Sequence, residues 1–444
     1  MARHGTKSII IQALVSSATF GSGASQVCGP STEKQQPGWR PQRIHLAVAL
    51  ALLTQLASAC VVEPLSSERA GSIRYSMPAP SESENYCAWY AEAAGGVLYF
   101  GEAAFWSAMR AAADDPMADL AVPGPQPIGR FDLNRERFIE PLDVTETGAR
   151  SGVWDVLPHP NGRIYFTTFY ETAGFVDPAS GTSRRFPELG DGLNELAHGE
   201  DGNIIVSRYG GHGGNADASG SLVVFSPDGA LVLEAPLAAP DGLALAPKTV
   251  AWDPRARRYW IAADLVWRDT SQPAPISMHP ALVLDDSGRE VARIDEVELH
   301  FVRFADGEAS GRGVAVIEAA GELRLIELDE SDPSLQLTVG RGKLLDGDFP
   351  AEVDFVQDVS FGPSDEVVVT RWSGLVHVVR KAAHAPVSSI QLPREDGLYY
   401  AAALTTDGRV CATHCHDRGT STAMDPIDIV CTSVGGSPDR ELTP

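Results

Sequence analysis

Four stretches of this 444-residue chain repeat one pattern, in which an apolar strand, a tight turn and a second strand follow one another. The turn is Asn-Gly, Asp-Gly or Asp-Glu and lies seven residues after the first residue of each copy. The copies begin at Trp154 (WDVLPHPNGRIYFTTF), Asn194 (NELAHGEDGNIIVSRY), Asp358 (DVSFGPSDEVVVTRW) and Tyr400 (YAAALTTDGRVCATHC). Unrelated segments do not keep such spacing, so the sequence predicts four copies of one β-hairpin.

Weaker copies of this hairpin fill the gaps, at 89–103, 250–264 and 300–318. Several hairpins precede a second strand pair: 128–133 with 138–142, 175–177 with 182–186, 222–226 with 231–234, and 281–285 with 290–294. Units of four antiparallel strands and about 50 residues, repeated around a ring, are typical of an all-β β-propeller. We expect seven blades, with six as the alternative because the unit near His300 is irregular. The segment 103–119 is the one helical candidate.

The last unit shows only three strands, at 399–404, 409–414 and 427–432. We expect the segment Ile73–Tyr75 to supply the fourth strand, because pairing the two ends of the chain closes the ring and covers its exposed edges. The predicted organisation is an extension with a signal peptide (1–59), a flexible tether (60–84), the propeller (85–436) and a disordered tail (437–444).

The N-terminal region carries a predicted export signal. Arg40 and Arg43 precede an apolar run, LAVALALLTQL, which is too short to span a bilayer and has the flanks of a secretory signal. The run ends in Ala-Ser-Ala before Cys60, an ending similar to the lipobox of bacterial lipoproteins. This resemblance implies that Cys60 is lipidated and anchors the protein in the bacterial cell envelope, on the periplasmic face or the cell surface. Secretion without an anchor is the alternative.

Cysteine usage agrees with export. Two of the six cysteines fall in the leader, and the even number that remains indicates two disulfides with three possible pairings, among Cys87, Cys411, Cys415 and Cys431. One of these four lies near the start of the folded region, so we expect at least one bond to join its two ends. The segment Cys411–His416 also holds two thiols and two imidazoles, which makes zinc the alternative to disulfides there.

The charge balance narrows the class of partner. With 35 basic and 59 acidic residues the formal net charge is −24, which repels nucleic acid and anionic lipid. The expected partners are therefore a small molecule, a glycan or an envelope protein, with the membrane contacted through the lipid anchor alone and the chain a monomer. No G-x-S-x-G, P-loop, H-E-x-x-H or dinucleotide motif occurs.

Polar residues recur at two positions of the repeat, both expected at one mouth of the central channel. One set ends the second strand of each hairpin: Glu102, Thr168, Arg208, Asp264, Arg371 and His414. The other set starts the first strand: Asn194 with Glu195, Asp358, and also Trp154 and Tyr400. Their recurrence predicts a polar pocket on the axis. The alternative is that these groups only meet solvent or tie blades together.

The residue types suggest two kinds of ligand for this pocket. Carboxylate and amide oxygens from separate blades are the ligands that a hard cation prefers, so we expect a divalent cation, Ca²⁺ or Zn²⁺, at Glu102, Asn194, Asp264 and Asp358. Arg208 and Arg371 can grip a carboxylate or phosphate, or else neutralise acidic neighbours. Candidates for a catalytic role are Asp264, Asp358 and His414.

The unit PHPNGRIYFTT, with Ser180-Gly181 downstream, resembles blades of the gluconolactonase/regucalcin-like propellers, of the virginiamycin B lyase group and of NHL repeats. The gluconolactonase resemblance implies a divalent cation held at the channel mouth by a Glu, an Asn and an Asp from different blades. Glu102, Asn194 and either Asp264 or Asp358 are nearest to these by position. The family's Asn-Gly-Leu motif occurs here only as Asp241-Gly-Leu, with its hairpin displaced.

From these features we predict a lipid-anchored, envelope-exposed propeller that binds a protein, a glycan or a small molecule. The alternative is a metal-dependent hydrolase or lyase of the gluconolactonase-like type, with its site at the channel mouth. There a cation would polarise a carbonyl group and a carboxylate would act as the base.

Overall fold

The computed structural model describes residues 72–76, 88, 90–101, 127–147, 152–168, 172–186, 192–209, 219–267, 279–295, 297–305, 312–319, 322–328, 343–345, 355–364, 366–380, 387–393, 397–415 and 427–434. Cys60, Cys87, Glu102, the predicted helix at 103–119, the predicted leader and the predicted tail lie outside these ranges. Within the described residues, no helix is long and apolar enough to cross a membrane.

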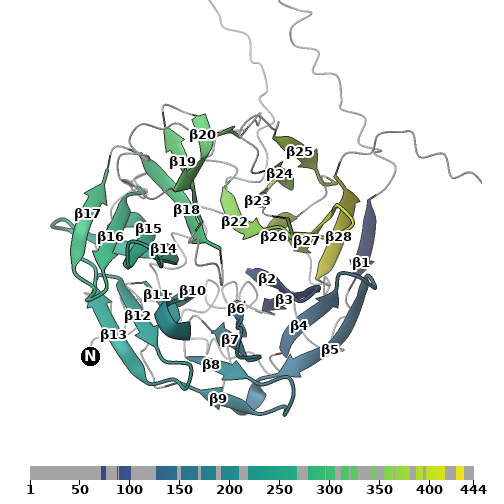
Figure 1. Cartoon of the computed structure of the whole chain (residues 1–444), viewed down its shortest axis with the longest axis horizontal. Helices are drawn as coiled ribbons and strands as arrows, with labels where there is room; N and C mark the ends of the chain where they lie inside the picture. The colour runs from purple at the N-terminus through teal and green to yellow at the C-terminus, as the bar shows by residue number, and fades with distance from the viewer. Residues whose placement is uncertain are drawn as a thin grey trace, which may run out of the picture.

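Seven antiparallel sheets of four strands each surround a central axis like the blades of a propeller (Figure 1). This confirms the predicted seven-bladed β-propeller. The unit near His300 has four strands like the others, so the six-bladed alternative was wrong. Among the described residues the helical elements are two 3-10 turns, η1 (Thr145–Thr147) and η2 (Glu200–Gly202).

Each of the first four blades is built from strands consecutive in the chain. Blade 1 contains β2 (Ala91–Ala94), β3 (Val97–Gly101), β4 (Pro127–Asp132) and β5 (Arg137–Asp143). Blade 2 contains β6 (Asp155–Pro158), β7 (Ile164–Thr167), β8 (Ala173–Val176) and β9 (Ser183–Arg185). Blade 3 contains β10 (Leu193–His198), β11 (Ile204–Arg208), β12 (Ser221–Phe225) and β13 (Leu231–Pro236). Blade 4 contains β14 (Leu243–Asp253), β15 (Arg258–Trp267), β16 (Ala281–Asp285) and β17 (Glu290–Ile294).

The last blade differs from the others because it also takes a strand from the N-terminal side. Blade 5 contains β18 (Glu298–Phe304), β19 (Gly313–Ala319), β20 (Glu322–Leu328) and β21 (Lys343–Leu344). Blade 6 contains β22 (Val356–Phe361), β23 (Val367–Arg371), β24 (Leu375–Val379) and β25 (Ser388–Gln391). Blade 7 contains β26 (Leu398–Leu404), β27 (Arg409–Cys415), β28 (Asp428–Ser433) and β1 (Ile73–Ser76).

The apolar core consists of separate layers, each lying between two neighbouring blades. Every one of the seven blade interfaces holds its own cluster of buried apolar side chains. Between blades 5 and 6, for example, Val314 and Val316 pack with Val367 and Val369. Because the β-branched residues of the inner strands face the neighbouring sheets, apolar burial takes place between blades and polar groups can occupy the axis.

Strand β1 closes the ring, as the sequence predicted. It pairs antiparallel with β28, where Ile73 lies opposite Cys431 and Tyr75 opposite Ile429. Outside the ladder, Arg74 Nη1 lies 2.9 Å from Asp428 Oδ2. The purple strand β1 lies beside the yellow strand β28 in Figure 1, so the two ends of the described chain share one sheet.

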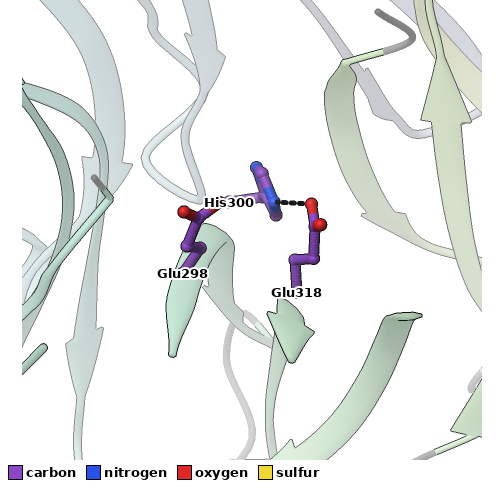
Figure 2. A group of neighbouring side chains, drawn as sticks. All are labelled: Glu298, His300 and Glu318. Carbon is purple, nitrogen blue, oxygen red and sulfur yellow. Dashed lines mark ion pairs between the residues drawn. The ribbon is translucent and has the colours of Figure 1, made fainter. Parts of the chain in front are cut away.

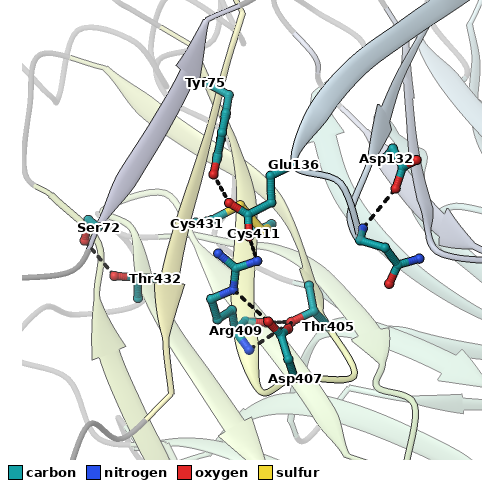
Figure 3. Close-up of a disulfide and its surroundings, with 11 residues drawn as sticks. Ser72, Tyr75, Asp132, Glu136, Thr405, Asp407, Arg409, Cys411, Cys431 and Thr432 are labelled. Carbon is teal, nitrogen blue, oxygen red and sulfur yellow. Dashed lines mark hydrogen bonds and ion pairs between the residues drawn. A yellow bond between two sulfur atoms is a disulfide. The ribbon is translucent and has the colours of Figure 1, made fainter. Parts of the chain in front are cut away.

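The seam between blades 7 and 1 is held by polar contacts around Glu136, in the β4–β5 turn (Figure 3). The Tyr75 hydroxyl donates a hydrogen bond to its carboxylate, and Arg409 forms an ion pair with it. The Tyr75 ring also packs against Phe131, with ring centroids 5.2 Å apart. One blade-1 acid therefore connects β1 and β27 of blade 7.

The disulfide of the seam blade links two neighbouring strands rather than the two ends of the domain. Cys411 on β27 and Cys431 on β28 lie opposite each other and are bonded (Figure 3). Cys415 also forms a disulfide. The thiols of Cys411 and Cys415 are therefore not zinc ligands. Cys87 lies outside the described residues, and the expected bond between the two ends of the domain stays a prediction.

The strand register corrects the alignment of the repeats by one residue. Pro158 pairs with Ile164 across its hairpin, and Phe361 pairs with Val367 across the corresponding hairpin of blade 6. Counting back three residues makes Asp358 the equivalent of Asp155. Aligning the repeats by their turn residues had instead matched Asp358 with Trp154. The reason is that the turn of the blade 6 hairpin begins one residue earlier than its Asp-Glu pair suggests.

We predict that β1 is required for a stable ring. A chain that begins at residue 77 lacks the Arg74 partner of Asp428, whose side chain is 2% exposed. Because a buried charge that loses its partner costs about 3–5 kcal/mol, the free energy of unfolding in urea should fall by at least that amount. A chain that begins at residue 72 keeps β1 and is the control. Equal stability of the two chains would show that β1 does not close the ring.

Candidate functional site

Side-chain oxygens beside the axis connect blades 2, 3 and 4 each to the next blade of the ring. Asp155 Oδ2 accepts a hydrogen bond from the Leu196 N–H of blade 3 at 2.6 Å, and Glu195 Oε2 accepts one from the Val250 N–H of blade 4 at 3.1 Å. Thr249 does the same on β14, where its Oγ1 accepts from the Val302 N–H of blade 5 at 3.2 Å. We call the place of these residues on the inner strands the axial position: Asp155, Glu195, Thr249 and, in blade 6, Asp358.

These connections follow from β-bulges in the inner strands. The pairing of β10 with β11 skips Asn194 and Glu195, and the inner strands of blades 4, 5 and 6 skip Lys248, His300 and Gln357. A bulge interrupts the ladder, so a backbone N–H next to it needs another partner. The axial oxygens of blades 2, 3 and 4 accept from the N–H groups that follow the bulges of blades 3, 4 and 5. The axial acids therefore have a structural role. Such a role is the alternative that the sequence left open, in which polar groups tie neighbouring blades together.

One arginine lies among the acids of the channel. Arg303, on β18, forms an ion pair with Glu92 on β2, and its Nη1 lies 3.7 Å from Asp358 Oδ1. The same nitrogen donates to the Val359 carbonyl at 3.0 Å, which joins blade 5 to blade 6. The charges of Glu92 and Arg303 also act on Asp155 across the axis. The channel therefore gathers acids from blades 1, 2, 3 and 6 around Arg303.

Burial shifts the protonation of the axial acids. It raises the pKa of Asp155 to about 8, with the charge of Glu92 adding to the shift. It also raises the pKa of Asp358, to about 7, although Arg303 opposes this. The pKa of Glu195 is raised well above its ordinary value by burial and then by the charge of Asp155. A buried carboxyl with a pKa near 7 can hold or release a proton at neutral pH.

The structure gives the predicted cation ligands separate protein partners. Asn194 is fully buried, its Oδ1 accepts from Trp154 Nε1 at 2.6 Å, and its Nδ2 donates to the Lys248 carbonyl at 3.0 Å. Asp264 contacts His279 and Lys248 in blade 4, whereas Asp358 contacts Arg303. Glu102 lies outside the described residues. The four-residue cation site stays a prediction.

The other predicted mouth residues also lie against protein groups. Arg208 Nη1 lies 3.2 Å from Glu234 Oε1 on the outer strand of its own blade. Arg371 is buried, and its charge helps to lower the pKa of Glu318 and of His377. His414 is buried with its ring 4.6 Å from that of Tyr399. Neither arginine is shown gripping a ligand, and that role stays a prediction.

A charged arc at the mouth of blades 4 and 5 includes residues that the sequence analysis did not single out. His279 Nδ1 lies 2.5 Å from Asp264 Oδ1, and its ring is 5.2 Å from that of His300. His300 Nε2 in turn lies 3.5 Å from Glu318 Oε2. Burial acts to raise the pKa of Asp264, but Lys248 and His279 outweigh it and lower that pKa.

The repeat itself contained the signal for this arc. Lys248 and His300 occupy the bulge position that Asn194 holds in blade 3, and Glu318 pairs with the residue two before the bulge, as Asp264 does. The longer loop between β18 and β19 made the fifth unit irregular in the sequence. For that reason the hairpin of this unit was predicted, but His300 and Glu318 were not included among the polar residues expected at the channel mouth.

A cavity of about 290 Å³ lies among the inner strands of blades 2 to 5. Residues from the second halves of β10, β14 and β18, and the residues that follow these strands, form most of its wall. Glu195 and Arg303 are polar groups in this wall, and Trp252 and Phe304 are aromatic ones. Because β18 begins at the charged arc and ends at this cavity, the two sites lie toward opposite mouths of the channel.

Comparisons with known proteins add little to this geometry. No protein-family model matches the chain, and no curated protein matches it. Among solved structures, 969 chains match. One, from "Crystal Structure of Mitotic Checkpoint Complex", has a TM-score of 0.49 and 9% identity, over 94% of this chain and 99% of that chain. A likeness at this TM-score carries no argument about function, so the fold stands on its strand topology.

The raised pKa values predict that stability falls as pH rises. A carboxyl whose pKa is higher in the folded than in the unfolded protein stabilises the fold below its unfolded pKa and loses this contribution as pH rises through the folded pKa. For Asp155 this window runs from 3.8 to about 8. The free energy of unfolding in urea should therefore be lower at pH 8 than at pH 5.

Asp155→Asn should flatten this dependence, by at most about 1.4 kcal/mol per pH unit for one proton. Asp228→Asn removes the same charge from an exposed turn and is the control. A slope that Asp155→Asn leaves unchanged would show that Asp155 does not hold the extra proton.

Proposed function

We propose that this protein is a binding module that takes a small polar molecule, of about the size of a monosaccharide, into its central channel. The observation that carries the proposal is the cavity of about 290 Å³. This volume lies just below the range for drug-sized ligands, about 300–1,000 Å³, so only a small molecule fits. Its wall combines the aromatic rings of Trp252 and Phe304 with the carboxyl of Glu195, and sugars commonly bind where apolar ring faces meet a few polar groups.

The chemistry of Glu195 suits such a ligand. One of its oxygens accepts the Val250 N–H. Its raised pKa favours the protonated carboxyl, which can both donate and accept hydrogen bonds, as a sugar hydroxyl does. A protonated wall also avoids the cost of placing another charge in an acidic channel. These points support a neutral ligand over an anion.

A second candidate function is a hydrolase or lyase at the channel. It is favoured by Asp358, because its pKa of about 7 matches that of a general base at neutral pH. The buried Asp155 carboxyl is the other candidate for this role. An assay with glucono-1,5-lactone distinguishes the two functions. Hydrolysis of the lactone that EDTA abolishes would favour the metal-dependent enzyme over the binding module.

Filling the cavity should abolish binding without unfolding the protein. Ala197 is half-buried on β10 and lines the cavity, so Ala197→Trp should block it. We expect glucose, galactose or N-acetylglucosamine to raise the melting temperature of the wild type, because a ligand at one hundred times its Kd stabilises the fold by about 2.7 kcal/mol. In the blocked variant that shift should vanish.

Ala256→Trp makes the same change in the exposed β14–β15 turn and is the matched control. It should keep the shift in melting temperature. The proposal fails if none of the three sugars stabilises the wild type, or if the shift persists in Ala197→Trp.

The place of this module is also a proposal, and it rests on the sequence alone. An apolar run followed by Ala-Ser-Ala and Cys60 supports lipid anchoring at the bacterial cell envelope. Cys60→Ser should move the protein from the membrane fraction to the soluble fraction, because it removes the acceptor of the lipid. Cys28→Ser, a cysteine outside the motif, is the control. A wild type and a Cys60→Ser variant that fractionate alike would contradict lipidation.

A further inference from the structure

Three potential metal ligands meet at the mouth of blade 5 (Figure 2). The ligand atoms of Glu298, His300 and Glu318 all lie within 4.8 Å of one another. Glu298 begins β18 and lies directly opposite Glu318 on β19, while His300 sits in the bulge of β18. Two acids opposite each other on paired strands repel, so this arrangement is favourable only if something positive lies between them.

Two buried atoms of this cluster lack hydrogen-bond partners. His300 is 6% exposed, and neither its Nε2 nor the Oε2 of Glu318 has a hydrogen-bond partner. The 3.5 Å between these two atoms allows attraction but exceeds the usual hydrogen-bond length. In Figure 2 the imidazole points toward the Glu318 carboxylate. A buried polar atom without a partner costs about 1–3 kcal/mol, and a shared cation would satisfy both atoms.

The spacing fits a small divalent ion. Zn²⁺ binds nitrogen and oxygen at about 2.0–2.2 Å in a tetrahedron, which places neighbouring ligand atoms about 3.3 Å apart. The 3.5 Å between His300 Nε2 and Glu318 Oε2 is close to that value. Glu298 is half-buried at the strand end, so a rotation of its side chain can bring its carboxylate to the same ion.

The protonation states also suit a metal. Burial lowers the pKa of His300, with Glu318 opposing, which favours the neutral imidazole that binds metals. The pKa of Glu318 is lowered by His300 first and, among weaker causes, by Arg371, which keeps it ionised. Lys248 also faces the cluster, but Asp264 lies 3.8 Å from its Nζ and offsets its charge.

A supporting pair stands beside the three ligands. His279 donates to or accepts from Asp264 through Nδ1 at 2.5 Å, and its ring lies 5.2 Å from that of His300. Metal sites commonly have a carboxylate–histidine pair that fixes the orientation of an imidazole. The Asp264–His279 pair lies next to the proposed ligand His300.

We propose that Glu298, His300 and Glu318 bind one divalent metal ion, Zn²⁺ rather than Ca²⁺, at the mouth of blade 5. Mixed nitrogen and oxygen ligands favour Zn²⁺ over Ca²⁺, which prefers six to eight oxygens. This inference goes beyond the proposed sugar binding and is independent of it, because the cavity lies toward the other mouth. It also uses a different set of residues from the cation site predicted from the sequence.

Isothermal titration of the EDTA-treated full chain with ZnCl₂ tests the site. The wild type should bind one equivalent at this site and show a raised melting temperature, since the folded state alone holds the three ligands together. His300→Gln and Glu318→Gln each remove one of three ligands and should weaken that binding at least tenfold. Glu322→Gln, an equal charge change in the same blade at an exposed position, should leave it unchanged.

Two outcomes would overturn the site. In the first, the wild type does not bind Zn²⁺. In the second, His300→Gln and Glu318→Gln bind one equivalent of Zn²⁺ as tightly as the wild type does. Should the buried His300 variant not fold, Glu298→Gln at its half-buried position carries the test with the same expected tenfold loss. Co²⁺ provides a further readout, because its visible absorption in the wild type should show tetrahedral nitrogen and oxygen ligation that Glu318→Gln removes. Sugar binding in the channel should be unaffected in all of these variants.

Discussion

The hydrogen bond from an axial side chain to the backbone of the next blade is the interaction on which this ring depends. Apolar packing between sheets is strong but has no direction, so by itself it allows neighbouring blades to slide. Asp155, Glu195 and Thr249 each accept one backbone N–H at a defined place in the next inner strand. These bonds set the height of blades 3, 4 and 5 against the blade that precedes each of them, and Arg303 does the same between blades 5 and 6.

The acidity of the channel follows from this architecture. Asp and Glu side chains are long enough to reach the backbone of the next blade. Because several of them lie near one axis, however, like charges are buried close together. Arg303 neutralises part of this negative charge. The pKa values of Asp155 and Asp358 are raised, so bound protons neutralise a further part. A channel of this kind favours neutral or cationic ligands. The proposals of a neutral sugar in the cavity and a metal ion at the mouth both agree with that electrostatic character.

Local features of the fold could be read from the sequence with good accuracy, and the errors have physical causes. The predicted strands 281–285 and 290–294 have the same bounds as β16 and β17, because alternation and a short turn at Asp286-Ser-Gly define them locally. Asp155 was missed because the blade 6 turn begins one residue early, which misaligned Asp358. Glu318 was not added to the mouth residues because a long loop separates β18 from β19, and loop length is not constrained by the blade.

The sequence alone determined that the chain forms a ring of four-stranded blades and that Ile73–Tyr75 completes the last one, because strand alternation, turn chemistry and one unpaired edge are properties of short segments. The tertiary structure decided what the polar residues do. Asn194 became a link between Trp154 and the Lys248 backbone, while His300 and Glu318 met as a potential metal site. Such roles depend on distances between strands and blades, which vary with each bulge and cannot be read from the spacing of residues along the chain.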